Sequence, residues 1–261
     1  MYRIGTTSYI VPADILPNVD YLAGRVADIQ LVLFETDTHG GNLPDAPLCR
    51  ALRERAERHG MTYTVHLPLD LRLADGGSAA HESLIKARRA IDATRGLEPV
   101  GYTLHLDAAR LAPPWGTCRE NALPLETWQE QAARALETVA EWVPEPGLLG
   151  VENLEKWDPG AFAPVLDRVP VSRTVDIGHL WLEGRDAAEA LAAWLPRTRM
   201  VHLHGIGTRD HQSLRLVPRE KLAPVLKLLK ERFSGVVTLE VFNEQDLAES
   251  LDAVREHGEA A

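Results

Sequence analysis

Short apolar runs rich in β-branched residues recur along the chain, and each has the length of a β-strand. Between them lie longer segments in which apolar residues follow helical spacing. The expected strands are residues 3–8, 28–35, 62–67, 101–107, 148–153, 173–177, 200–204 and 236–242. The expected helices are residues 18–26, 45–59, 80–95, 125–143, 159–168, 185–195, 218–233 and 243–257.

Strand and helix thus alternate throughout, with breakers such as Gly60, Gly96 and Pro144 after the helices. Eight units in 261 residues are about 33 residues each, which suits the repeat of a (β/α)8 barrel. An open doubly wound sheet would need a glycine-rich phosphate loop after its first strand, but this strand runs into TTSYIVP. The pattern predicts an α/β fold, a single (β/α)8 TIM-barrel domain over residues 1–261.

The composition, 45% hydrophobic and 25% charged, is that of an ordinary globular protein with a sizeable core. A formal charge of -10 argues against a protein whose affinity comes from neutralising a nucleic-acid backbone. Cys49 and Cys118 lack metal-ligand spacing, and the first residues do not resemble a secretory signal. Because the apolar runs are shorter than the roughly 18 residues of a membrane span, we expect a cytoplasmic protein with no membrane partner.

Ten histidines stand out in this composition, and many of them lie with carboxylates at the ends of expected strands. In a barrel the carboxyl ends of all strands meet on one face, where the chemistry takes place. The polar residues at or just after these ends are His66, His105, Asp107, Glu152, Asn153, Asp176, His179, His202, His204, Asp210, His211 and Glu240. Period-two alternation places His202 and His204 on one face of their strand, and likewise His105 and Asp107.

Any one of these histidines alone would be interpreted as an interior residue satisfied by a hydrogen bond. Together with several carboxylates, however, they would form a repelling and partly desolvated cluster unless something compensates the charge. Divalent cations do so, and imidazole with carboxylate suits zinc, and also manganese or iron. The pattern predicts a site for two or three metal ions.

Metal clusters of this kind carry out a limited set of reactions. The commonest is hydrolysis of a phosphoester, in which the metals generate hydroxide and clamp the attacking and leaving oxygens. Sugar isomerisation or epimerisation is the main alternative, and Glu35 at the end of the second expected strand could serve it as acid or base. A surface charge at a strand end explains Glu35 equally well. A non-catalytic metal carrier is a further alternative.

The ordered set of ligands resembles the xylose isomerase-like barrel superfamily, and within it the branch of endonuclease IV. The resemblance covers about two thirds of the chain and implies three zinc sites. Those sites would be His66, His105 and Glu152; Glu152, Asp176, His202 and Glu240; and His179, Asp210 and His211. Asp210 and His211 are adjacent, whereas the endonucleases place one residue between the last Asp and His, so the third site departs from the family pattern.

The amino-terminal segment GTTSYIVPADILPNV, followed by DIQLVLFE, resembles a different branch, the cobamide remodelling phosphodiesterases of the CbiR family. The segments VHLHGI and RDHQSL extend this resemblance over most of the chain. It implies hydrolysis of the phosphodiester in the nucleotide loop of a cobamide. Glu152 would then bridge two metals and fix a metal-bound hydroxide, and His204 or Asp107 would orient a ligand or the phosphate. His204 binding substrate directly is the alternative.

The loops at the barrel mouth help to weigh the two relatives. An abasic-site endonuclease must grip and bend duplex DNA with basic, intercalating loops. The arginines Arg72, Arg110, Arg119, Arg209 and Arg215 are interspersed with Asp75, Asp107, Glu120 and Asp210. This mixture favours a small-molecule phosphodiester such as a cobamide over nucleic acid. Trp115, Trp157 and Trp181 follow expected strands and could either pack against a corrin ring or cover the loop ends.

Overall fold

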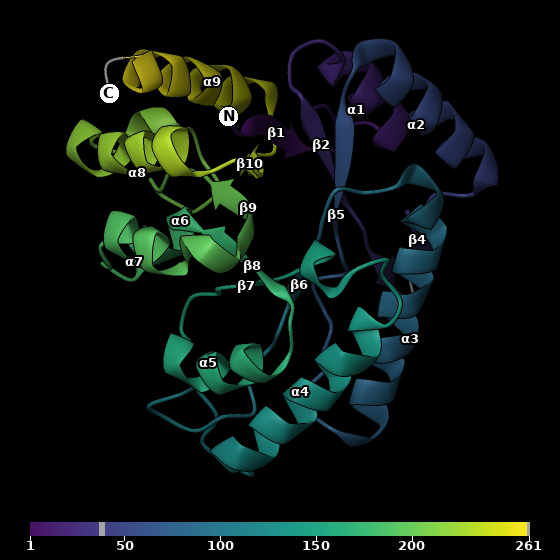
Figure 1. Cartoon of the computed structure of the whole chain (residues 1–261), viewed down its shortest axis with the longest axis vertical. Coiled ribbons are helices and arrows are strands. Elements are labelled where there is room, and N and C mark those ends of the chain that lie inside the picture. Colours follow the sequence, from purple (N-terminus) through teal and green to yellow (C-terminus); the bar gives the residue numbers. More distant parts are fainter. Residues whose placement is uncertain (37–39, 260–261) are drawn as a thin grey trace.

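Eight parallel strands close into a barrel in the order β1-β10-β9-β8-β7-β6-β5-β2, as the computed structural model shows for residues 1–36 and 40–259 (Figure 1). The predicted TIM-barrel fold is therefore confirmed. The strands are β1 (Arg3–Thr7), β2 (Asp28–Val32), β5 (Thr62–His66), β6 (Tyr102–His105), β7 (Leu149–Glu152), β8 (Ser172–Asp176), β9 (Thr198–Leu203) and β10 (Val236–Leu239). Each expected strand corresponds to one of them.

The helices lie outside the strands, as Figure 1 shows. They are α1 (Ile15–Leu22), α2 (Ala46–His59), α3 (Gly77–Thr94), α4 (Leu125–Ala140), α5 (Pro159–Arg168), α6 (Ile177–Leu182), α7 (Ala187–Trp194), α8 (Arg219–Arg232) and α9 (Glu244–Glu259). The buried apolar side chains of strands and helices form one core between the two layers. Within the described residues, none of these helices is long and apolar enough to cross a membrane.

The ends of α2 follow the rules for helix capping. The side chain of Asp45 accepts a hydrogen bond from the amide of Leu48, and a proline occupies the first turn. Gly60 ends the helix in the left-handed conformation, with φ of 64°. These are the residues on which the predicted bounds of this helix rested.

Helix α1 begins three residues earlier than the sequence predicts and ends at Leu22. The prediction used Asn18 as the start, but Asn18 is buried inside the helix and its side chain bonds back to the preceding loop. Its Oδ1 accepts from the amides of Ile10 and Val11, and its Nδ2 donates to the carbonyl of Ala13. The amide thus fixes the loop that follows β1.

Three elements, two short strands and a short helix, are not predicted by the hydrophobic pattern. The strands β3 (Glu35–Thr36) and β4 (Gly40–Gly41) pair antiparallel after β2. The short helix α6 follows β8 directly, because Asp176 ends the strand and its Oδ1 accepts a hydrogen bond from the amide of His179, 2.7 Å away. A six-residue helix is too short to show a clear apolar period, yet it carries one of the predicted ligands.

The barrel interior below the mouth is filled by small and polar side chains. Thr103 and Thr174 share a hydrogen bond of 2.9 Å across the interior. Gly150 leaves room for them, because a Cβ there would overlap the Thr174 hydroxyl and lie 2.9 Å from the Met200 methyl. The packed interior supports the ring of polar side chains above it.

Candidate metal centre

The strand ends bring most of the predicted ligands together at the mouth of the barrel. His66, Glu152, Asp176 and His202 are the inward-facing residues that end or nearly end their strands, and each is at most 2% exposed. Their nitrogen and oxygen atoms form three overlapping groups, in each of which the ligand atoms lie within 4.8 Å of one another. The groups share two carboxylates, those of Glu152 and Asp176.

The first group is the predicted one of His66, His105 and Glu152. The Nε2 atoms of the two histidines lie 3.2 and 3.1 Å from the same oxygen, Glu152 Oε2. His66 Nδ1 lies 2.7 Å from the carbonyl of Leu67, an arrangement in which Nδ1–H donates and Nε2 keeps its lone pair. Both imidazoles therefore face the carboxylate in the orientation that a metal ligand needs.

The second group also matches the predicted set, Glu152, Asp176, His202 and Glu240. His202 Nδ1 lies 2.9 Å from Glu152 Oε1, 3.0 Å from Glu240 Oε2 and 4.0 Å from Asp176 Oδ2. Burial opposes charge on the ring, but the carboxylates of Glu240 and Glu152 raise the pKa of His202 well above its usual value. His202 thus lies between three buried carboxylates.

The third group differs from the predicted His179, Asp210 and His211. It contains Asp176, His179, His204 and His211, without Asp210. Asp210 has a half-exposed side chain whose Oδ1 is 3.4 Å from His211 Nδ1. Asp210 lies in the loop after β9, in which the neighbouring His211 has a positive φ of 52°.

His204 reaches this group from just beyond β9 and stacks on His211, with ring centroids 4.1 Å apart. The amide of His211 and the carbonyl of Gly205 both contact His204 Nδ1, over 3.0 and 3.2 Å, so the backbone occupies this nitrogen and Nε2 faces the group. That nitrogen lies 3.3 Å from Asp176 Oδ1. The geometry therefore allows His204 to orient Asp176, and places its ring against Gly178, where a Cβ would overlap the ring atoms of His204.

His179 and Asp176 are held by the residue after β7, Asn153. Its side chain accepts from the amide of Asp176 and donates to the Asp176 carbonyl, each over 2.9 Å. His179 Nδ1 lies 3.0 Å from the Asn153 carbonyl, which directs Nε2 toward Glu155 Oε2 at 3.6 Å. The sequence showed Asn153 at a strand end, but it offered no reason to select Glu155.

Several buried polar atoms at the mouth have no hydrogen-bond partner within the described part of the chain: Asp176 Oδ2, His204 Nε2 and Glu240 Oε2. Glu240 Oε2 is close to His202 Nδ1, but that nitrogen is directed to Glu152. Burial alone would lower the pKa of His179 and His211. The surrounding carboxylates outweigh this effect and raise the pKa of each to about 9. Buried polar atoms without hydrogen-bond partners, among several carboxylates and imidazoles, are what two or three divalent cations would coordinate.

Other predicted residues lie outside the three groups. Asp107 is half-buried in the loop after β6, where Oδ1 accepts from the amide of Ala109, and burial raises its pKa. Glu35 forms an ion pair of 2.8 Å with Arg89 of α3, which agrees with the surface interpretation of this carboxylate. Trp181 is 8% exposed and belongs to the apolar core, against which Trp115 and Trp157 also pack. The tryptophans therefore cover the loop ends.

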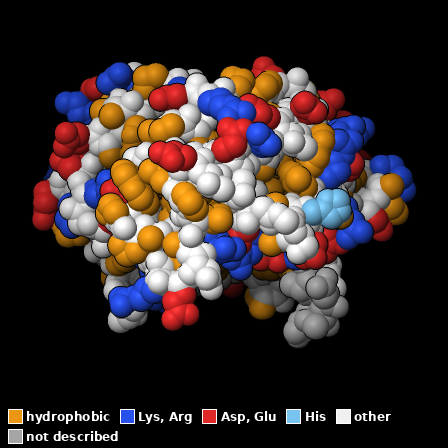
Figure 2. Space-filling model, turned by 90° about the horizontal axis from the view of Figure 1, so that it is seen from below, with side chains coloured by type: hydrophobic (Ala, Val, Ile, Leu, Met, Phe, Trp, Pro, Cys, Tyr) orange, Lys and Arg blue, Asp and Glu red, His pale blue; other side chains and the backbone are white. Residues whose placement is uncertain are grey.

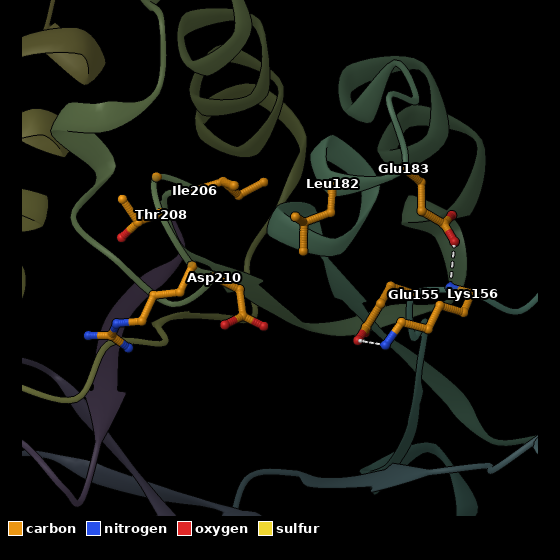
Figure 3. A pocket seen from close by; sticks show the side chains of 9 residues that line it. Glu155, Lys156, Leu182, Glu183, Ile206, Thr208 and Asp210 are labelled. Atoms are coloured by element: carbon orange, nitrogen blue, oxygen red, sulfur yellow. Dashed lines mark hydrogen bonds and ion pairs between the residues drawn. The ribbon is translucent and has the colours of Figure 1, made fainter.

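A pocket of about 580 Å³ opens beside the third group (Figure 3). One wall comes from the loop after β9, with Ile206, Thr208 and Asp210, and the other from the loop after β7, with Glu155 and Lys156. Leu182 of α6 adds an apolar surface between the two walls. The pocket thus combines apolar, acidic and basic side chains next to the candidate metal ligands.

The chain belongs to the family described as xylose isomerase-like TIM barrel, whose model matches residues 26–257. A D-tagatose 3-epimerase-like protein is similar in structure, with TM-score 0.76 and 19% identity over 99% of this chain and 97% of that one. Endonuclease IV from Thermus thermophilus has TM-score 0.73 and 19% identity over 99% and 100%. The 3-keto-D-glucoside 4-epimerase YcjR from E. coli has 0.72 and 16% over 98% and 100%.

By their names these neighbours are a sugar epimerase, an epimerase-like protein and an endonuclease, and at such identities they show the fold alone. Among curated proteins, none matches this sequence. The reaction must therefore be inferred from the site.

Proposed function

We propose that this protein is a metal-dependent phosphodiesterase that hydrolyses the nucleotide-loop phosphodiester of cobamides. The observation that carries the proposal is the set of three overlapping ligand groups, which share Glu152 and Asp176. An isomerase needs only one or two metals to polarise a hydroxy-carbonyl. A larger cluster suits hydrolysis of a phosphodiester, in which the attacking oxygen, the leaving oxygen and the negative charge on the phosphoryl group all need stabilisation. The cobamide specificity rests on the amino-terminal resemblance.

Divalent cations at these groups would supply Lewis acidity for water and for the phosphoryl oxygens. The two oxygens of Glu152 face different groups, with Oε2 at the first and Oε1 toward His202. Asn153 holds the backbone of Asp176, the other shared carboxylate, and His204 approaches it from the third group. These contacts hold the shared ligands in place before substrate binds, as preorganised catalysis requires.

The pocket beside the third group supports a substrate larger than a phosphate. Leu182 and Ile206 offer apolar surface, and Arg209 supplies positive charge at its edge, whereas Lys156 is paired with Glu155 at 3.5 Å. In the described structure the Arg209 guanidinium makes no hydrogen bond or ion pair, so it is available to a phosphate oxygen. Phe242, 40% exposed, lies with its ring 5.5 Å from that of His211 and adds an apolar edge.

Mixed surface charge favours a small substrate over DNA. The face in Figure 2 shows basic and acidic side chains side by side among apolar ones. Two of the arginines that the sequence suggested for the mouth are paired, Arg72 with Asp75 at 2.5 Å and Arg215 with Glu256 at 2.7 Å. Binding duplex DNA would instead call for unpaired cations along the track of the phosphates.

The decisive experiment is a chromatographic product assay of the metal-replete protein on a cobamide, with DNA containing an abasic site assayed in parallel. We expect release of a cobinamide phosphate and the lower-ligand riboside, and intact DNA. An unchanged cobamide would refute the assignment, and cleavage of the DNA alone would identify an endonuclease instead.

Sugar epimerisation is a second candidate, because two glutamates lie together in the second group. Glu152 Oε1 and Glu240 Oε2 both lie within 3.0 Å of His202 Nδ1, and paired carboxylates can serve as base and acid on opposite faces of a sugar carbon. The epimerase structures of similar fold give this candidate further support. Incorporation of solvent deuterium into ketoses, without any phosphorylated product, would favour it.

A further inference from the structure

Gln30 of β2 is a fully buried polar side chain that none of the predicted roles includes. It reaches across the barrel interior to β9, where its Nε2 lies 2.8 Å from His202 Nε2. The two residues are 172 positions apart in sequence. His202 presents its other nitrogen, Nδ1, to the second ligand group. Gln30 thus contacts Nε2, the ring nitrogen of His202 that does not face the carboxylates.

The protons of this contact decide which nitrogen of His202 can bind a metal. With the amide in this orientation the nitrogen of Gln30 faces Nε2, and only a neutral ring with its proton on Nδ1, toward Glu152, could accept a hydrogen bond from it. In this arrangement Gln30 Oε1 is buried without a partner. A ligand at Nδ1 requires the reverse, with the proton on Nε2 and an acceptor beside it.

Rotation of the amide by 180° provides that acceptor in the same volume, because the oxygen and nitrogen of Gln exchange places. Oε1 would then accept from His202 Nε2–H, and its missing hydrogen bond would be made. We propose that Gln30 is a positioning residue that fixes His202 in the tautomer with a free Nδ1, and so sets the metal affinity of the second group. The inference rests on the metal centre of the proposed function, and not on the identity of the substrate.

Gln30→Met tests the proposal, because methionine matches the length of glutamine but is a poor hydrogen-bond acceptor. Loss of a hydrogen bond behind a ligating histidine weakens metal binding by about 10- to 100-fold. We expect that loss in titrations of the metal-free protein with Zn²⁺ against a chromophoric chelator. Gln30→Glu keeps an acceptor at the same place and should retain most of the affinity.

Thr103→Val is the matched control, since Thr103 is equally buried in the barrel interior but bonds to Thr174 and not to a ligand. It should bind Zn²⁺ like the wild type. A loss of affinity as large as that of Gln30→Met would show a general effect of removing interior polarity and would overturn the proposal. Unchanged affinity in Gln30→Met would overturn it as well.

A spectroscopic measurement decides the question even where Gln30→Met does not fold. In the zinc-loaded wild-type protein labelled with ¹⁵N-histidine, we expect the ring proton of His202 on Nε2, protected from exchange with solvent. A proton on Nδ1 in the loaded protein would refute the role of Gln30. A wild-type protein that binds no divalent metal would refute the metal centre itself, whereas normal loading with an inactive enzyme would leave Gln30 supported and refute only the phosphodiesterase.

Discussion

Among the individual residues, the shared carboxylates determine what this site can do. Glu152 uses one oxygen for two imidazoles and the other for His202. Burial opposes its ionisation, but His202 and the other two histidines hold the pKa of Glu152 well below its usual range. The residue is therefore ionised and contributes to two groups at once, so one substitution should affect both.

Glu152→Gln should leave the fold intact while reducing metal content and activity together. The amide keeps the shape of the side chain but removes the negative charge that faces the histidines and would hold two metals. We expect loss of activity by about 100-fold or more, with metal content measured by elemental analysis and folding by circular dichroism. Glu155→Gln, which alters a carboxylate beside His179 but outside the three groups, is the comparison. Near-native turnover with full metal occupancy in Glu152→Gln would contradict the bridging role.

The residues of the first two groups could be predicted from sequence because each ends a strand or lies just beyond it, and period-two alternation fixes which way it faces. The third group could not be predicted in full. His204 was expected near the site, but its approach to Asp176 depends on Gly178 in α6. Gln30 could not be predicted, because a single glutamine within a strand belongs to no motif of spaced ligands. It lies two residues after Asp28, on the same face of β2, and both are buried.

Among the helices and strands, α6 is the element that joins the second group to the third. Asp176 ends β8 and caps α6, and His179 follows one turn later. Asp176 can therefore belong to both the second and the third group. Capping of α6 fixes its carboxylate, and the first turn of the helix places the imidazole of His179 beside it. The weak apolar pattern of six residues hid the helix, but the spacing of Asp176 and His179 was visible in the sequence.

Gly178→Ala should disturb this element. The added Cβ would overlap the ring of His204, so either the ring or α6 must move, and overpacking of this kind costs about 1–3 kcal/mol. We expect a lower melting temperature and, in a zinc titration, weaker binding of the metal ion at the third group. Gly147→Ala is the control, since a Cβ at that position would approach the Ser172 hydroxyl no closer than 3.8 Å. Equal stability and stoichiometry in the two variants would contradict the close packing of His204.

For the barrel as a unit, closure was the most predictable feature, because eight strand–helix units fix both the closure and the face on which the ligands meet. What the pattern could not give is the polar content of the interior. We expect these polar residues to make stability depend on metal binding at the mouth and on pH at the opposite end, where the carboxyl of Asp28 accepts hydrogen bonds from Thr62 and Thr64.

Removal of metal should therefore lower the stability of the entire barrel. A ligand that binds only the folded chain adds about 2.7 kcal/mol when its concentration is 100 times its dissociation constant. We expect a chelator to lower the melting temperature in calorimetry and added Zn²⁺ to restore it. The Glu152→Gln variant should respond much less. An identical melting temperature with and without chelator would argue against metal bound at the mouth.

Asp28 should make stability depend on pH. Burial raises the pKa of this carboxyl from 3.8 to about 6, although the hydroxyls of Thr62 and Thr64 partly oppose the shift. The folded chain therefore keeps a proton that the unfolded chain releases between about pH 4 and pH 6. The stabilising effect is full below about pH 4 and is lost as the pH rises through about 6, an amount of up to about 3 kcal/mol.

Asp28→Asn should abolish this dependence, because asparagine does not titrate and keeps the size of the side chain. Urea unfolding of both chains in the presence of chelator, from pH 4 to pH 7, isolates the effect, since the mouth residues titrate alike in both and cancel in the difference. We expect the variant to gain stability relative to the wild type by up to about 3 kcal/mol over this range. Parallel stability curves would show that the carboxyl is ionised in the folded barrel throughout, with its two threonine hydroxyls sufficient to stabilise the charge.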